Sequence, residues 1–158
     1  MGAINNAFNQ AAGAAAGAAL AIKHAQETDF SKMNAADNSA LIARNQARAA
    51  TAEANAANDE AVKKGGLVEQ MTGAEKDREK AQKAFDKAIN SKNGSIKTKL
   101  KKRNDLIAAQ EAEMALNNKY KAIVDMNDRA AEQRAHADKA TKIAEKAQQK
   151  YQSKWGDK

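Results

Sequence analysis

The sequence contains no proline and no cysteine, and only 4% of its 158 residues are aromatic. Without proline, no residue forces a helix to kink or stop, so the helices can be long. Without cysteine, disulfide bonds and thiolate chemistry are excluded. The scarcity of aromatic side chains leaves alanine, about a quarter of all residues, as the main apolar component.

Side chains as small as alanine do not fill a thick core, but they allow helices to approach closely. We therefore expect an all-α protein built from long alanine-rich helices. These helices should form a coiled-coil or helical-hairpin assembly with little globular core.

Positive charge is concentrated in the second part of the chain. Residues 1–60 carry 4 basic and 6 acidic side chains, whereas residues 61–158 carry 23 and 14, which gives net charges of −2 and +9. A basic region of this kind favours contact with polyanions, either nucleic acid or an anionic lipid surface. Solvated helices are also rich in lysine for solubility alone.

The first 22 residues, MGAINNAFNQAAGAAAGAALAI, contain no charged side chain. Their length reaches the roughly 20 residues of a membrane-spanning helix, but alanine gains little in lipid and four amides oppose insertion. Two interpretations follow: a helix that inserts conditionally into a membrane, and an alanine-rich helix packed against other helices, with small-xxx-small spacing that allows close approach. In both, the contacts come from Ile4, Phe8, Gly13, Gly17, Leu20 and Ile22.

Polar residues follow at once, and Thr28 and Ser31 offer N-cap oxygens for a new helix near Lys32. We therefore predict a first segment over residues 1–26 and a second helix over residues 32–64. The second helix has the strongest periodicity in the chain, since alternating steps of three and four residues reach only apolar positions. This alanine seam predicts a closely packed helical pair or ring of copies through Met33, Ala36, Ala40, Ala43, Ala47, Ala50, Ala54, Ala57 and Ala61.

The second helix should end at Lys63-Lys64-Gly65-Gly66, which places basic residues before glycine. Gly65 and Gly66 are the best hinge candidates in the chain. A capping-box pattern at Thr72–Glu75 then predicts the start of a helical hairpin over residues 72–155. Its turn lies at Ser91–Ser95, and its last helix runs from Ile96 to about residue 151.

Five basic residues crowd the first two turns of that last helix, where the helix macrodipole favours acidic residues. A bound phosphate would offset this unfavourable placement, so the cluster is a candidate for polyanion binding. No aromatic residue interrupts it, which argues against base stacking and sequence-specific recognition. The other interpretation is a solvated basic patch. The cluster consists of Lys97, Lys99, Lys101, Lys102 and Arg103.

Motifs for catalysis are not visible in the sequence. There is no glycine-rich phosphate loop, no zinc-ligand spacing and no cysteine nucleophile, and the two histidines lie far apart at positions 24 and 136. We expect no enzymatic activity, no cofactor and no metal site.

The order of features through residues 1–95 carries a resemblance to a known class. An uncharged Gly/Ala-rich run follows Met1-Gly2, an Asn/Ala/Gln-rich helix contains residues 38–50, and Gly73-Ala74-Glu75-Lys76 precedes a Gly94-Ser95 turn. This layout resembles the small internal virion proteins of short-tailed bacteriophages, which are packaged in the capsid and ejected ahead of the genome. The DNA pilot proteins of small single-stranded DNA phages have a similar plan.

The resemblance implies a virion protein that self-assembles through its helices and helps the genome pass across the host cell envelope. It implies a homo-oligomer with other virion proteins, non-specific DNA and the host membrane as partners. The protein would be located in the virion and, on infection, in the host envelope. The alternative is a purely structural helical connector or scaffold within a larger assembly, without membrane contact.

Overall fold

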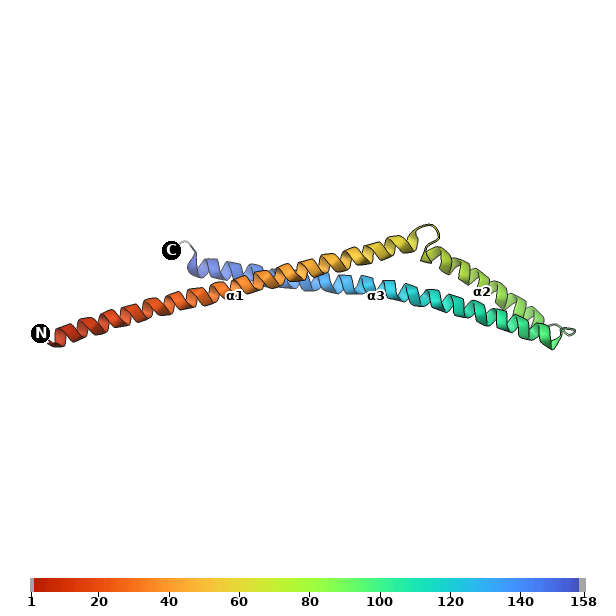
Figure 1. The fold of residues 1–158 in the computed structure, drawn as a ribbon, viewed down its shortest axis with the longest axis horizontal. Coiled ribbons are helices and arrows are strands. Elements are labelled where there is room, and N and C mark those ends of the chain that lie inside the picture. Colours follow the sequence, from red (N-terminus) through yellow and green to blue (C-terminus); the bar gives the residue numbers. More distant parts are fainter. Residues whose placement is uncertain (1, 157–158) are drawn as a thin grey trace. The chain divides into compact units, whose positions relative to one another are not determined.

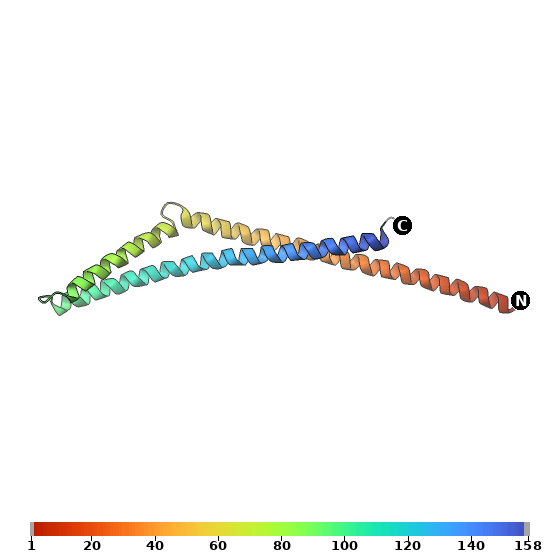
Figure 2. The ribbon, with the colours of Figure 1, turned by 180° about the vertical axis from the view of Figure 1, so that it is seen from behind.

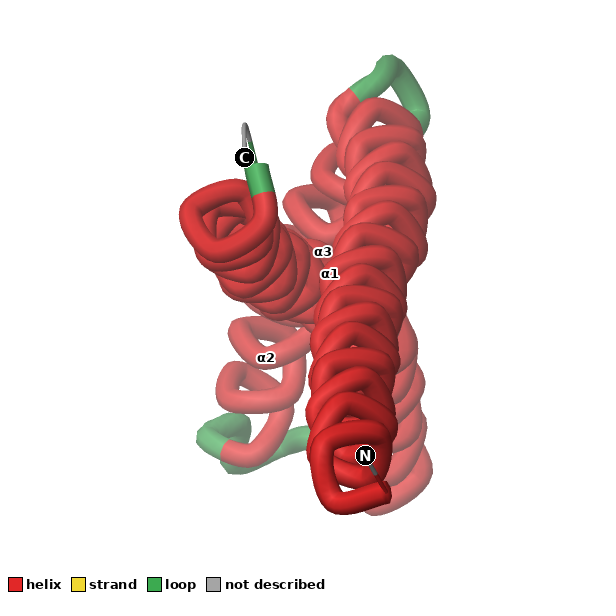
Figure 3. The backbone as a smooth tube through the Cα atoms, turned by 90° about the vertical axis from the view of Figure 1, so that its left-hand side faces the viewer, coloured by secondary structure: helices red, strands yellow, loops and turns green. Residues whose placement is uncertain are grey.

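The structure is a computed structural model that describes residues 2–156, and these residues form three helices and no strand. The helices are α1 (Gly2–Val62), α2 (Leu67–Ile89) and α3 (Ile96–Trp155) (Figure 1 and Figure 2). Figure 3 shows that loops are confined to the two connections and the C-terminal end. The expected all-α class is confirmed. Met1, the first residue of the uncharged run, lies outside the described residues.

Helix α1 is continuous where the sequence predicted a break between residues 26 and 32. The Thr28 hydroxyl donates a hydrogen bond of 2.8 Å to the carbonyl oxygen of His24, one turn earlier in the same helix. Thr28 therefore does not cap a new helix, because its side chain is already satisfied inside the existing one. Residues 2–26 and 32–62 of the two expected segments therefore belong to one helix.

The connection between α1 and α2 is a tight turn at the two predicted glycines. Gly65 has a φ of 75°, a conformation that favours glycine. Gly66 donates its backbone N–H to the Lys63 carbonyl oxygen at 2.8 Å, and a Cβ at Gly66 would lie 2.5 Å from the Glu60 carbonyl oxygen. The turn therefore depends on both glycines, while their role as a hinge stays a prediction.

Helix α2 begins at Leu67, five residues before the predicted capping box. The carboxylate of Glu69 accepts the Gly65 backbone N–H at 2.8 Å, one residue before the N-cap residue Gly66, which has no side-chain cap hydrogen bond. The Thr72 hydroxyl donates to the Val68 carbonyl oxygen at 3.0 Å, as in a helix interior. The predicted start at residue 72 is wrong, because Thr72 lies inside the helix and its hydroxyl bonds to a carbonyl of the preceding turn instead of capping a helix end.

The predicted turn between α2 and α3 is confirmed. Ser95 caps α3, since its hydroxyl oxygen accepts the Thr98 backbone N–H at 3.1 Å. Helix α2 and the first half of α3 lie side by side as a hairpin in both Figure 1 and Figure 2. An ion pair between Arg78 on α2 and Glu113 on α3 joins the two helices.

The described residues divide into two compact units, each described by itself: residues 2–47 with 133–156, and residues 48–132. In the first unit, α1 and the end of α3 pack antiparallel, because Phe30 contacts Tyr151 while Ala43 and Ala47 pack against Ala137. In the second unit, Ala54, Ala61, Leu106 and Ala130 are buried. The core is thin in both units, as expected.

All nine seam positions are buried or half-buried. Ala43 and Ala47 contact α3 of the same chain, whereas the periodicity of the sequence predicted contacts between copies. At these two positions the seam meets α3 of the same chain, because α3 is helical over 60 residues and offers its own alanines at heptad spacing. Contact between copies through the seam stays a prediction.

A polar pair interrupts the apolar contact in the second unit. Asn58 on α1 and Asn127 on α3 each donate a side-chain N–H to the other's amide oxygen at 2.9 Å. The second amide proton of Asn127 bonds to the Ile123 carbonyl oxygen at 2.9 Å. A satisfied Asn pair between packed helices disfavours other registers, because a shift would leave both amides unpaired.

Replacing Gly66 by alanine should lower the free energy of unfolding by about 1 to 3 kcal/mol, because the new methyl group overlaps backbone oxygens. Urea denaturation followed by circular dichroism measures the change. Gly73 lies inside α2, where a methyl group meets no described atom within 4 Å. Gly73→Ala is the matched control and should raise stability by about 0.5 to 1 kcal/mol. Equal effects of the two substitutions would contradict the described turn.

Candidate functional site

The N-terminal part of α1 has no packing partner in the unit that contains it. Every residue from Gly2 to His24 is exposed, whereas packing against α3 begins near Asp29. The large apolar side chains of this free segment (residues 2–24) are 57% to 71% exposed. In Figure 1 this part of α1 runs past the C-terminal end of α3. The exposed large side chains are Ile4, Phe8, Leu20 and Ile22.

The six predicted contact residues divide between two faces of the free segment. At 3.6 residues per turn, Ile4, Phe8 and Ile22 fall within about 40° of one another. Gly13, Gly17 and Leu20 fall on the opposite face, together with the amide side chains at positions 6, 9 and 10. The segment is therefore weakly amphipathic, because three of its four large apolar side chains share one face, whereas Leu20 lies with the amides and glycines on the other.

The glycines of the free segment are not needed for packing inside the described chain. A methyl group at Gly13 or Gly17 would meet no described atom within 4 Å. Among the helices formed by residues 2–156, none is long and apolar enough to cross a membrane.

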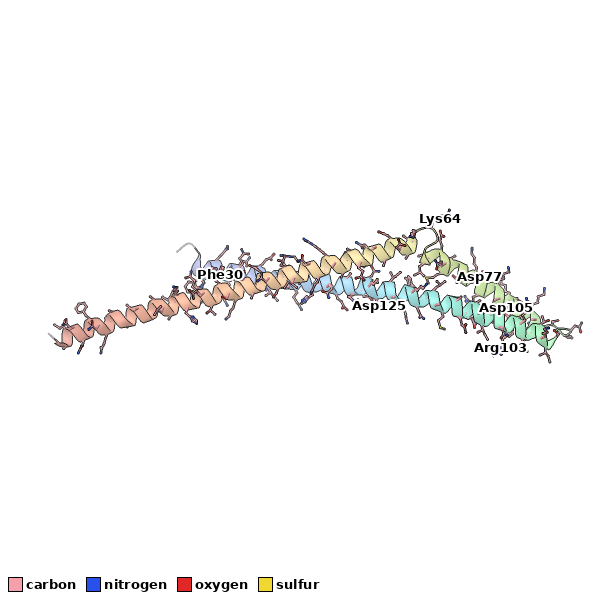
Figure 4. All side chains as sticks on the ribbon, in the orientation of Figure 1. Phe30, Lys64, Asp77, Arg103, Asp105 and Asp125 are labelled. Atoms are coloured by element: carbon pink, nitrogen blue, oxygen red, sulfur yellow. The ribbon has the colours of Figure 1, made fainter. Side chains whose placement is uncertain are left out.

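A group of five side chains fixes the end of α3 on α1, and we call it the terminal clasp. The Asp29 carboxylate accepts hydrogen bonds from Lys154 Nζ and Trp155 Nε1, both at 3.0 Å. Phe30 and Tyr151 form an edge-to-face pair with ring centroids 5.7 Å apart. Figure 4 shows Phe30 on α1 beside the end of α3. The clasp sets the boundary between the packed part of α1 and the free segment.

The hydrogen bond from the Trp155 indole and then that from Lys154 lower the pKa of Asp29 below its ordinary value of 3.8. Both hydrogen bonds stabilise the charged carboxylate. In addition, Lys154 Nζ lies 5.0 Å from the centroid of the Trp155 ring. This group was not predicted from the sequence. The one signal was the scarcity of aromatic residues, since three of the six in the chain gather here.

The five predicted polyanion-binding residues encircle the start of α3 and do not share one face. Lys99 and Lys102 are half-buried and line a groove toward α2, which also carries Lys87. The other three, Lys97, Lys101 and Arg103, are exposed. Figure 4 shows Arg103 on the side of α3 away from α2. The structure thus brings two lysines of the cluster together with Lys87 of α2.

None of the five basic residues forms an ion pair within the described part of the chain. Their charges therefore reach solvent without a carboxylate partner in contact. We call this region, with Lys87, the basic turn. Mutual repulsion and the helix macrodipole both oppose this arrangement, and an anion at the turn relieves both.

The described residues show no group of His, Asp and Glu side chains that could hold a metal ion. Both histidines are exposed. No protein-family model matches the chain, and comparison with curated proteins and with solved structures also finds no match.

Acidification should open the terminal clasp. Because the pKa of Asp29 is lowered by folding, its contribution to stability is present above pH 3.8 and is lost as the pH falls through the lowered value. Trp155 is the only tryptophan, so its fluorescence reports directly on the clasp. We expect its emission to shift below pH 3.8 in the natural chain and to stay nearly constant in Asp29→Asn.

The control variant is Asp37→Asn, which removes an exposed carboxylate from the same helix outside the clasp. It should retain the natural pH profile. The same acid shift in Asp29→Asn as in the natural chain would refute this assignment of the titration.

Proposed function

We propose that the chain is a structural protein of a phage virion that self-assembles through its helices and helps the genome pass across the host cell envelope. The observation that carries this proposal is the free segment, a fully exposed stretch of helix that has no charged side chain over residues 2–22 and extends beyond the packed part of α1. Exposed apolar surface of this extent favours a partner, either protein or lipid. The resemblance in layout to internal virion proteins supplies the biological setting.

The thin alanine contacts support passage through a narrow portal. A buried CH₂ group contributes only about 0.8 kcal/mol, so alanine contacts hold helices together weakly for their length. Each helix keeps its backbone hydrogen bonds when it separates from its neighbour. The chain is therefore suited to losing its tertiary contacts and reforming them later, as an ejected protein must.

The basic turn supports contact with the genome. Its charges have no carboxylate partner, and it carries no aromatic side chain for base stacking. Non-specific contact with phosphates needs only such charges. The proposal gives the protein no catalytic role.

Removing large apolar side chains from the free segment should weaken binding to anionic liposomes. We expect Phe8→Ser with Ile22→Ser to lower the affinity at least about tenfold, since burial of each side chain contributes about 1.5 to 3 kcal/mol. Co-sedimentation at physiological salt measures the affinity. The control is Leu41→Ser with Ile42→Ser, which removes two comparably exposed side chains elsewhere on α1 and should have little effect.

The purely structural connector remains the second candidate. It is favoured by the intramolecular packing of the alanine seam, which shows that α1 already serves as a packing element within one chain. If the natural chain does not bind liposomes, and Phe8→Ser with Ile22→Ser and Leu41→Ser with Ile42→Ser bind them no differently, the connector role replaces the envelope role.

Replacing all five residues of the predicted cluster by glutamine should weaken binding to duplex DNA of any sequence. The magnitude of the slope of log affinity against log salt should fall by as much as about 4.5, because each of the five phosphate contacts contributes about 0.9. Electrophoretic mobility shifts at several salt concentrations measure it. A matched control removes five exposed lysines elsewhere on α3: Lys121, Lys139, Lys142, Lys146 and Lys150. Equal losses in both variants would indicate general charge attraction instead of a binding site.

A further inference from the structure

The alanine seam of α1 continues in the same heptad phase beyond the end of α3. Stepping back from Met33 by alternate four and three residues, the pattern crosses Asp29 and Gln26 and then becomes apolar again. This second stretch lies in the free segment, and all of its members are exposed. We call it the free seam, and it consists of Phe8, Ala12, Ala15, Ala19 and Ile22.

The free seam is self-complementary when it is reversed. A large side chain stands at each end, and three alanines lie between them. If two copies run antiparallel with Ala15 opposite Ala15, Phe8 of one copy lies opposite Ile22 of the other. A two-fold axis repeats this contact on both sides, as a closed symmetric dimer requires.

We propose that the free seam binds the free seam of a second copy of this chain, antiparallel, with the two-fold axis at Ala15. This inference rests on the self-assembly part of the proposed function and specifies its partner and register. It extends the contact that α1 already makes within the chain, where Ala43 and Ala47 pack antiparallel against Ala137. The new contact uses the same helix, the same phase and the same relative direction.

Charge and polarity support a second copy as the occupant. The segment from Gly2 to Ile22 has no charged side chain, so two copies meet without repulsion and without burying a charge. The amides at positions 6, 9 and 10 lie on the opposite face and stay in water. The alanines at the centre allow the two backbones to approach closely, while Phe8 and Ile22 supply most of the buried area.

The first test places one charge on the two-fold axis. Sedimentation equilibrium of the full natural chain should show a concentration-dependent monomer–dimer equilibrium. Ala15→Glu should weaken dimerisation at least about tenfold, because two like charges then face each other in an apolar contact. The control is Ala14→Glu, the same change one residue away and outside the seam, and it should weaken dimerisation less than about twofold.

The second test fixes the direction of the two helices. The chain has no cysteine, so any disulfide bond between two copies must form through a cysteine that is introduced by mutation. Ala15→Cys should form a disulfide dimer on mild oxidation. Ala12→Cys alone should not, because an antiparallel arrangement separates the two sulfurs by about 9 Å along the axis. A mixture of Ala12→Cys and Ala19→Cys should cross-link to each other, since these positions face across the axis.

Three results would overturn the proposal: a monomer at every concentration, equal effects of Ala14→Glu and Ala15→Glu, or cross-linking of Ala12→Cys with itself as efficient as that of Ala15→Cys. Association that appears only with lipid vesicles would assign the free seam to a membrane surface instead. These outcomes are separate from those of the proposed function, because DNA binding through the basic turn is measured independently. A natural chain that stays monomeric but still binds DNA would refute only the pairing of the free seams.

Discussion

The packing of alanine against alanine between α1 and α3 is the contact on which the rest of the structure depends. It holds Ala43 and Ala47 against Ala137, and it lets two long helices lie close without large side chains between them. Each methyl contributes little, so the contact has to be long, and the absence of proline makes that length available. Because the alanine side chains are small, the protein has little core. The register of the helices then depends on a few polar groups such as the Asn58–Asn127 pair.

The two candidate regions are set apart by chemistry as well as by position in the chain. The free segment has no charged side chain over residues 2–22, and the basic turn has positive charges without an ion-pair partner among the described residues. One is suited to apolar partners and the other to phosphates. Their separation in sequence by the whole packed part of α1 and by α2 means that either contact can form without competing for the same residues.

The sequence predicted regular features well and tertiary contacts poorly. The seam was found from the periodicity of alanine in a stretch without proline. The glycine pair and the Ser95 cap indicated the two connections between helices, since these signals are local. The break near residue 28 was wrong because Thr28 bonds within its own helix. The contact of Ala43 and Ala47 with Ala137 was not predicted, because heptad spacing does not say which helix packs against a seam, and pairing between copies stays a prediction. The terminal clasp was missed because Asp29 and Trp155 are 126 residues apart and no local rule pairs them.

The terminal clasp also determines how far the free segment extends. Because α3 ends beside Asp29, the reach of the free segment equals the length of α1 that precedes this residue. Inserting one heptad before the clasp would extend that reach by about 10 Å without disturbing any packed residue, and deleting one would shorten it equally. Changes of seven residues would therefore alter the span between partners while preserving the face presented to them, so related chains can differ in reach and keep one mode of packing.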